Sequence, residues 1–469
     1  MTISRRNLII ASVVLVLAAV SLTWVMRGKS SVEEYVAKLR AKGERLYFTD
    51  PPFPKMTNGT PGLDKFVTAA DSIGGFNPIL VMDVSTSGVA FVAWQRSPMI
   101  DGLVRTNSMQ WSSLLTILQK NDKPLHEIRE SLAEPEPDMG WQTNIFTYRR
   151  VFIQQRRGVQ LLSAAAIADL HETNFDGAFE NLQALAHLSQ LERDENTLVA
   201  QMIRVAIAGV GLSTTWEALQ SDGLSDAQWK KLQDEWSKID LLKGIERGFV
   251  GERLYCFSHM EMARKGATNA VSWGGSTTVK WQDRLRTTIW RATVAQQDEM
   301  FYLKTLGHYI DKCRLASSGT PVAEVNQLLQ HDIDELNRTL SQPSAVFKYP
   351  FSAIAIPNFA RACAAVFRCE VQRRLTITAI GIKRYQLCYG KLPETLNVLA
   401  PEFFPEVLLD PMDWKPLHYR VNRDGTYTLY SVGENGKDDG GNPAWPTKGQ
   451  PGWLTGMDIV WPKPSSARN

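Results

Sequence analysis

The sequence has little cysteine and no large excess of either charge. Its five cysteines are an odd number in 469 residues, and no two form a CxxC pair. That pattern excludes the disulfide framework of a small secreted domain, so we expect buried thiols. One disulfide can form if the chain is exported, because the compartment outside the cytoplasm is oxidising. The net charge is only +3, from 52 basic and 49 acidic residues. The chain therefore lacks the excess of positive charge that is typical of nucleic-acid-binding proteins.

Short motifs of common catalytic sites are also missing. The chain contains no HExxH, no GxSxG and no GxxxxGK[ST], and none of its seven histidines pairs with another at ligand spacing. Zinc catalysis needs three converging ligands, and a phosphate loop needs its glycine-rich turn. We therefore predict no catalytic residue and expect a non-enzymatic protein. An exported hydrolase with a site built from dispersed Glu, Asp and His side chains stays open.

What the chain does have is a long uncharged run near its start. Leu8 to Met26 spans 19 positions without a charge and follows Arg5 and Arg6. At ~1.5 Å per residue a helix of this length crosses a ~30 Å hydrocarbon core, and the preceding arginines favour a cytoplasmic N-terminus. A signal peptide cleaved after the small residues Ala19 and Ser21 is a second interpretation, and a buried core helix a third. Each of the first two exports the rest of the chain.

The long middle region has the periodicity of helices. Apolar residues recur at helical spacing in several stretches separated by short polar breaks, and Leu198–Leu219 is apolar on nearly all sides, which is typical of a helix buried between others. Ser225 is a candidate N-cap for a helix with Trp229, Leu232 and Trp236 on one face. Strand alternation is scarce, and its best candidate is Ile79–Trp94. We expect a body of antiparallel helix hairpins.

Tryptophan is unusually frequent, with 14 residues. Trp273, Trp281 and Trp290 cluster where a glycine-rich loop enters a predicted helix. Large aromatic residues at such a junction serve as core fillers with a polar handle, or mark a site for a partner. Both interpretations stay open from the sequence.

The periodicity becomes long and regular from Asn358. Apolar residues advance by threes and fours up to Gly390, which predicts one amphipathic helix with one buried stripe, and with Arg368, Arg373, Arg374 and Arg384 on other faces. After it, two alternating segments, 417–421 and 426–431, flank the turn Asn422–Gly425 and predict a β-hairpin.

The order of motifs here resembles a known family. A long helix, YxxxxGKLPETLNVL, LLDPMDWKPLHY, a hairpin, YSVGENGKDDGG and DIVW follow one another over about residues 358–462. This order is similar to the C-terminal domain of the major pseudopilin of type II secretion systems. Residues 1–30 contain no Phe-Thr-Leu-Ile-Glu-type start of that family, and the helical body separates the pilin-like helix from the uncharged run.

The resemblance implies a calcium site in the acidic loop. Asp438, Asp439 and Asp458 with the Asn435 amide are the ligands it implies, helped by backbone carbonyls, because calcium takes about six to eight oxygen ligands in irregular geometry. Asn435 stands where the family often has Asp, and Gly456 where another Asp would precede Asp458. The expected affinity is therefore weak.

Together these observations predict a mainly α chain of three parts. They are a cytoplasmic stub and transmembrane helix (1–30), an α-helical hairpin body (31–345) and a pilin-like α/β module with a long helix and a small antiparallel sheet (346–469). We expect a single-pass protein of the inner (cytoplasmic) membrane with its bulk in the periplasm, binding the membrane through Leu8–Met26 and other envelope proteins through its body. The expected role is structural or partner-binding; an accessory component of a type II secretion or pilus-like system is the alternative.

Overall fold

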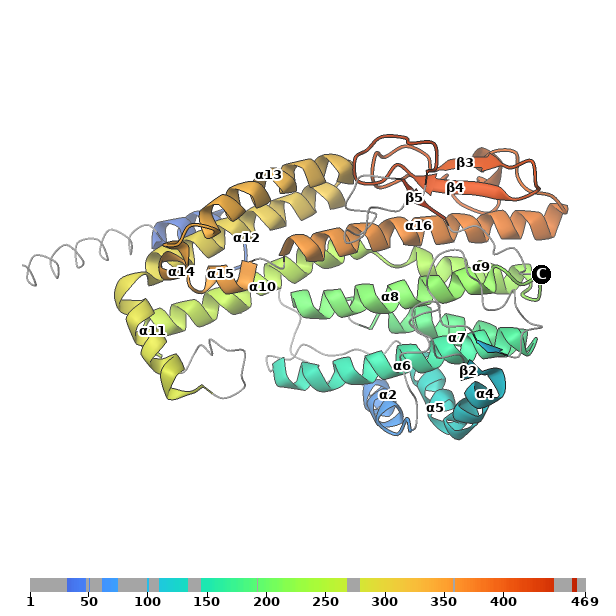
Figure 1. Ribbon diagram of the computed structural model, residues 1–469, viewed down its shortest axis with the longest axis horizontal. Helices are drawn as coiled ribbons and strands as arrows, with labels where there is room; N and C mark the ends of the chain where they lie inside the picture. Colours follow the sequence, from blue (N-terminus) through green and yellow to red (C-terminus); the bar gives the residue numbers. More distant parts are fainter. Residues whose placement is uncertain are drawn as a thin grey trace, which may run out of the picture. The chain divides into compact units, whose positions relative to one another are not determined.

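The computed structural model describes residues 32–47, 50, 61–74, 99–100, 109–133, 145–191, 193–267, 279–356, 359–442 and 458–461. The described part is mainly helical and carries a small three-stranded antiparallel sheet, which confirms the predicted class at that level (Figure 1). The predicted span Leu8–Met26 and the strand candidate Ile79–Trp94 lie outside the described residues.

The contacts divide the chain into two compact units, each assembled from three segments. The first unit consists of Met1–Phe53, Phe249–Lys312 and Leu328–Arg361. The second consists of Pro54–Gly248, Cys313–Gln327 and Ala362–Asn469. The sequence predicts a boundary between residues 345 and 346, with a C-terminal module that folds on its own. Independent folding of this module stays a prediction.

Helix hairpins form the larger part of the second unit. Its helices up to residue 248 are α2 (Pro61–Asp71), α4 (Trp111–Lys120), α5 (Asp122–Ala133), α6 (Ile145–His171), α7 (Phe175–Leu188), α8 (Leu198–Ala218) and α9 (Asp226–Ser237). Helix α6 packs against α7 and α8, and α7 packs against α5, α8 and α9. The short strands β1 (Met99–Ile100) and β2 (Met109–Gln110) pair antiparallel beside α4.

Helix α8 is the one described helix that is long and apolar enough to cross a membrane. More than half of its most apolar stretch (56%) is buried inside the protein. The helix also buries Gln201, Arg204 and Glu217, and Arg204 Nε donates to the Ser189 carbonyl at 2.9 Å. These contacts are those of a core helix, as its all-round apolar pattern predicts.

Helix α9 begins and packs as its sequence predicts. The Ser225 hydroxyl accepts from the Gln228 N–H while the Gln228 side chain accepts from the Ser225 N–H, which closes a capping box. Trp229, Leu232 and Trp236 on the inner face are fully buried. A Cβ at Gly211 of α8 would lie 2.6 Å from the Trp236 ring, so a glycine is needed for this approach.

The long C-terminal helix α16 (Phe359–Tyr389) ends where predicted, at Gly390 with φ +68°. The prediction of one buried stripe with arginines on other faces is wrong for two of the four arginines. Arg373 is only 8% exposed and Arg384 only 6%. Arg373 Nη1 donates to the Trp236 carbonyl at 2.9 Å, and Arg384 Nε to the Asp226 carboxylate at 2.7 Å. Both guanidinium groups are buried because α9 packs along this side of α16.

The predicted hairpin is confirmed to within one residue. Strands β3 (His418–Val421) and β4 (Tyr427–Ser431) pair antiparallel, with Val421 opposite Tyr427 and Gly425 at φ +81° in the turn. Strand β5 (Ile459–Val460) joins the other edge of β4, giving the order β3-β4-β5. The 3₁₀ helix η4 (Leu396–Leu399) lies between α16 and the sheet in the sequence.

The first unit is built on long helices. Residues 32–41 form a helix, followed by most of α10 (Leu241–Arg264), α11 (Trp281–Thr293), most of α12 (Ala295–Ser317), most of α13 (Val322–Leu340), α14 (Ala345–Lys348) and α15 (Ser352–Ala355). Val32, Val36 and Leu46 share one core cluster with Phe257 and Leu303. The chain just after the predicted membrane span is therefore part of this unit's core.

Candidate functional site

The four predicted calcium ligands lie in the loop that follows β4 and at the start of β5. The Asp458 carboxylate accepts from the Asp439 N–H at 3.3 Å and from the Gly441 N–H at 2.7 Å. Asn435 Nδ2 donates to Asp439 Oδ2 at 3.1 Å. Hydrogen bonds thus connect Asn435, Asp439 and Asp458 in one group, and the backbone of the loop folds back on β5.

Asp438 is held differently. Its Oδ1 accepts from the Tyr430 hydroxyl and from the Gly440 N–H, both at 2.8 Å, and its Oδ2 is 3.5 Å from His418 Nδ1. The hydrogen bond from the Gly440 N–H is the main reason why the pKa of the exposed Asp438 carboxyl is lowered, and the Tyr430 hydroxyl lowers this pKa further. The pKa of Asp458, in contrast, is raised by burial. Strand β4 therefore binds the Asp438 carboxylate through its Tyr430.

The oxygen donors of this loop suit a hard cation, but the structure brings them together only in part. In the described ranges, no three His, Cys, Asp or Glu side chains converge as metal ligands do. Residues 443–457, which separate Asp458 from the other three, lie outside the described part of the chain. The calcium site stays a prediction, for which Asn435, Asp439 and Asp458 are the best-placed side chains.

A buried carboxylate that the sequence did not single out positions this loop. Asp410, in the DPMDWKP segment, is fully buried and accepts from the Met412 N–H at 2.9 Å, the Ser431 hydroxyl at 2.8 Å and the Val432 N–H at 2.9 Å. Burial raises the pKa of Asp410, and these donors oppose that rise. Two motifs of the family resemblance, DPMDWKP and YSVG, are thus joined through one side chain.

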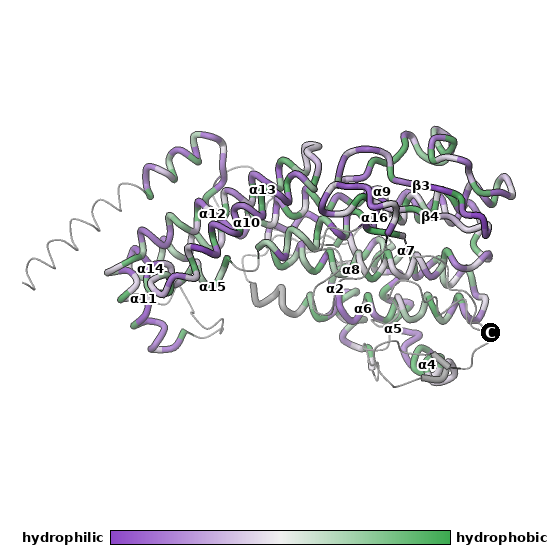
Figure 2. The backbone as a smooth tube through the Cα atoms, turned by 45° about the horizontal axis from the view of Figure 1, so that its top comes forward, coloured by the Kyte–Doolittle hydropathy of each residue, from purple (hydrophilic) through white to green (hydrophobic). Residues whose placement is uncertain are grey.

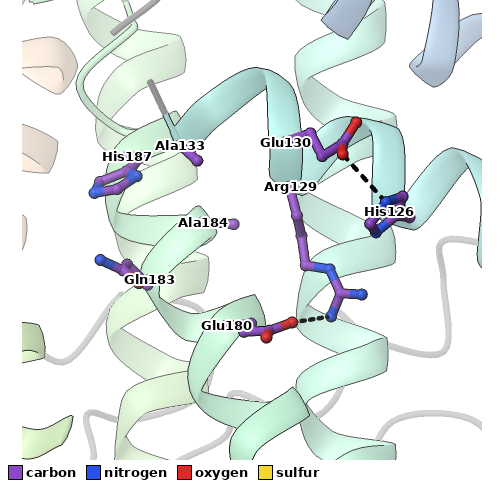
Figure 3. Close-up of a pocket in the computed structure, with 8 residues that line it drawn as sticks. All are labelled: His126, Arg129, Glu130, Ala133, Glu180, Gln183, Ala184 and His187. Atoms are coloured by element: carbon purple, nitrogen blue, oxygen red, sulfur yellow. Dashed lines mark ion pairs between the residues drawn. The ribbon is translucent and has the colours of Figure 1, made fainter. Parts of the chain in front are cut away.

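A surface pocket lies between α5 and α7 of the second unit, with a volume of about 260 Å³ (Figure 3). Arg129 Nη1 pairs with Glu180 Oε2 across it at 3.0 Å, and His126 Nε2 lies 3.3 Å from Glu130 Oε1. His187, on the opposite side from His126 in Figure 3, contacts the Leu132 carbonyl at 2.9 Å. The pocket is smaller than common ligand sites of about 300–1,000 Å³, and its charged groups pair with one another.

The first unit contains a carboxyl with a strongly shifted pKa. Glu299 on α12 is fully buried and forms an ion pair with Arg264 Nε of α10 at 2.8 Å. Burial raises the pKa of Glu299 to about 7, against the attraction of Arg264. Beside it, the Tyr47 hydroxyl donates to Glu261 at 3.2 Å. Carboxyl groups with a shifted pKa occur both at functional sites and in structural ion pairs. The ion-pair partner of Glu299 is Arg264 on the neighbouring helix α10 of the same core, which is typical of a structural ion pair.

Sequence reasoning missed the α5–α7 pocket, Asp410 and Glu299. His126 and His187 are far apart in the chain and line one pocket only because two helices pack, so no spacing rule finds them. Asp410 did carry a signal, since it opens the DPMDWKP motif. No family model, no curated protein and no solved structure matches this chain.

Proposed function

We propose that this chain is a membrane-anchored extracytoplasmic protein with a structural, partner-binding role, and that its C-terminal region is a calcium-stabilised, pseudopilin-like module. The anchor is the helix of Leu8–Met26, in the inner (cytoplasmic) membrane, and the bulk of the chain lies outside the cytoplasm. Leu8–Met26 is long enough to span the hydrocarbon core and carries no charge.

One observation carries the proposal. Residues 27–31 alone separate the uncharged run from helix 32–41, whose Val32 and Val36 are 0% and 8% exposed in the core of the first unit. A span that ends at Met26 would therefore continue almost directly into folded protein. An anchor with so short a connection holds its body against the bilayer surface rather than on a flexible stalk.

The module part of the proposal is supported by the agreement between motif order and local contacts. A 31-residue helix precedes a small antiparallel sheet, and Asp410 joins the DPMDWKP segment to the end of β4. These contacts join two of the quoted motifs, DPMDWKP and YSVG. This agreement supports a fold similar to that of the pseudopilin family, but a similar fold does not imply a similar activity.

The same motif order favours a second candidate, an accessory component of a type II secretion or pilus-like system. The two candidates differ in their partners. Cross-linking in intact cells, followed by solubilisation in mild detergent and capture of the chain, should recover other envelope proteins. Recovery of secretion-system components would select the second candidate.

The anchor is tested by extraction from membranes. We expect the native chain to stay in the membrane pellet at alkaline pH in carbonate and to need detergent for release. A variant with Leu15→Arg and Ala18→Arg should be released, because each arginine at the centre of a span costs about 2.5–3.5 kcal/mol. Lys29→Arg serves as the control and should behave as the native chain. Release of the native chain by carbonate contradicts the anchor, and a released body that begins near Leu22 selects a cleaved signal peptide.

A further inference from the structure

Helix α11 of the first unit exposes a stripe of large apolar side chains. Trp281, Leu285 and Ile289 are 70%, 53% and 55% exposed. They are four residues apart, which places them along one face of the helix. A contiguous apolar face of this kind on a soluble surface marks an interaction site.

The rotation of α11 is fixed by its opposite face. Asp283, Thr287 and Trp290 are 8%, 0% and 4% exposed, so this side is packed into the unit. The Asp283 carboxylate accepts from the Lys280 N–H at 3.0 Å at the start of the helix, and Trp290 Nε1 donates to the Asp298 carboxylate at 2.9 Å near its end. The exposed stripe is consequently a fixed feature of the surface.

A second exposed cluster is held by the same carboxylate. Asp298 also accepts from the Phe351 N–H at 2.9 Å and the Ser352 hydroxyl at 2.6 Å, which ties α15 and the preceding turn to α11. Helices α11, α14 and α15 lie close together in both views (Figures 1 and 2). The four most exposed large apolar side chains of the described residues all belong to these helices: Phe347, Trp281, Val346 and Ile354.

Basic side chains flank the stripe of α11. At about 100° per residue, Arg284 and Arg291 fall on one side of Trp281, Leu285 and Ile289, and Arg286 on the other. All three arginines are exposed, and the single acidic residue of the helix, Asp283, is buried. Lys348 of α14 is exposed as well. The exposed face thus combines Trp, Leu and Ile with positive charge alone.

We propose that α11, together with the α14–α15 turn, docks on the surface of an anionic lipid bilayer. Leu285, Ile289 and Phe347 enter the boundary between headgroups and acyl chains, Trp281 lies at headgroup level, and the three arginines contact lipid phosphates. The basic flanks favour lipid over a second copy of this face, because two such faces would repel. The inference rests on the proposed membrane anchoring, which holds the first unit beside the bilayer.

The test measures where position 285 lies in a reconstituted membrane. The full chain, with Cys388→Ser and Leu285→Cys, carries a spin label and is reconstituted into vesicles of phosphatidylcholine and phosphatidylglycerol. Oxygen concentrates in the bilayer and a nickel chelate stays in water, so the ratio of their accessibilities reports depth. We expect this ratio to be several-fold higher at 285 than for a label at Glu335→Cys, an exposed position on α13.

A second part of the experiment tests whether docking needs anionic lipid and the arginines of α11. In vesicles of phosphatidylcholine alone, or in a variant with Arg284→Gln, Arg286→Gln and Arg291→Gln, the ratio at 285 should fall to that of the control label. Equal ratios at 285 and 335 in anionic vesicles overturn the proposal. So does low accessibility to both reagents at 285, which means that protein covers the stripe.

Anchor and docking fail separately in this design. Retention of the labelled chain in carbonate reports the anchor, and the oxygen-to-nickel ratio reports α11. A chain that is retained but shows no oxygen preference at 285 removes the docking and leaves the anchor. A chain lost in carbonate that still prefers oxygen at 285 removes the anchor and leaves the docking.

Discussion

The carboxylate of Asp410 accepts a hydrogen bond from the Ser431 hydroxyl at 2.8 Å, across 21 positions of sequence. This contact joins the DPMDWKP segment to the end of the central strand, and the Val432 N–H adds a second bond to the same carboxylate. The acidic loop starts directly after these residues. Asp410 therefore fixes the start of the loop, and the contacts of Tyr430 and Asp458 hold the rest of it.

Replacing this side chain should loosen the C-terminal module. Asp410→Ala leaves buried donors of Met412, Ser431 and Val432 without their acceptor, and we expect a loss of about 3 kcal/mol in the free energy of unfolding. Thermal unfolding of the full chain measures it. Glu406→Ala, an exposed position nearby in the sequence, is the matched control and should change little. Equal melting temperatures for the two variants would contradict the role given to Asp410.

The pH dependence of stability should report Glu299. Its pKa rises by burial from an ordinary value of 4.5 to about 7 in the folded chain. The folded chain then binds this proton more tightly than the unfolded chain, so the free energy of unfolding should fall as pH rises from about 4.5 to about 7, by roughly 3 kcal/mol at most. Glu299→Gln should remove this part of the slope. Glu324→Gln, at an exposed position, should leave the slope of the unfolding free energy against pH unchanged. The same slope in both variants would contradict the role given to Glu299.

How far the sequence predicts this structure depends on the range of the signal. The N-cap at Ser225, the turn Asn422–Gly425 and the helix end at Gly390 depend on neighbouring residues, and all three predictions are confirmed. The burial of Arg373 and Arg384 depends on partners 137 and 158 positions away, which periodicity along one helix cannot reveal. Local chemistry is therefore predictable here, and pairing between helices is not.

The tryptophans of α11 make the same point. The sequence places Trp281 and Trp290 in one cluster and leaves core and partner roles open for both. In the structure Trp290 is 4% exposed and Trp281 is 70% exposed. Nine positions turn a helix by two and a half turns, so the two rings point to opposite sides. The core interpretation is therefore confirmed for Trp290 and wrong for Trp281, whose role in binding a partner stays a prediction.

The calcium site predicts a stability change that depends on one aspartate. For a weak site, millimolar CaCl₂ in place of EGTA should stabilise the full chain by about 1–2 kcal/mol and raise its Tm. Asp458→Asn should abolish the response, because Asp458 is the member that connects β5 to the loop. Magnesium at the same concentration should stabilise less. A Tm that ignores calcium, or that rises equally in the variant, would contradict the site.

Two thiols predict a chemical consequence of export. Cys313 and Cys363 are buried with their Sγ atoms 4.0 Å apart, and both are reduced in the structure. In an oxidising compartment we expect the pair to form one disulfide, giving up two protons and two electrons that reduce the disulfide of a thiol–disulfide oxidant to two thiols. Mass spectrometry of a non-reduced digest should find the linked peptides. Cys363→Ser should remove the link and Cys256→Ser should not; free thiols at both positions in the exported chain would argue against it.

In the proposed topology the folded chain lies outside the cytoplasm behind an N-terminal anchor. A reporter fused after residue 40 tests this topology in two versions: alkaline phosphatase, which is active only after export, and a fluorescent protein that matures only in the cytoplasm. We expect phosphatase activity in the membrane fraction and no fluorescence, because Arg5 and Arg6 keep the N-terminus inside. Fluorescence with an inactive phosphatase would contradict it.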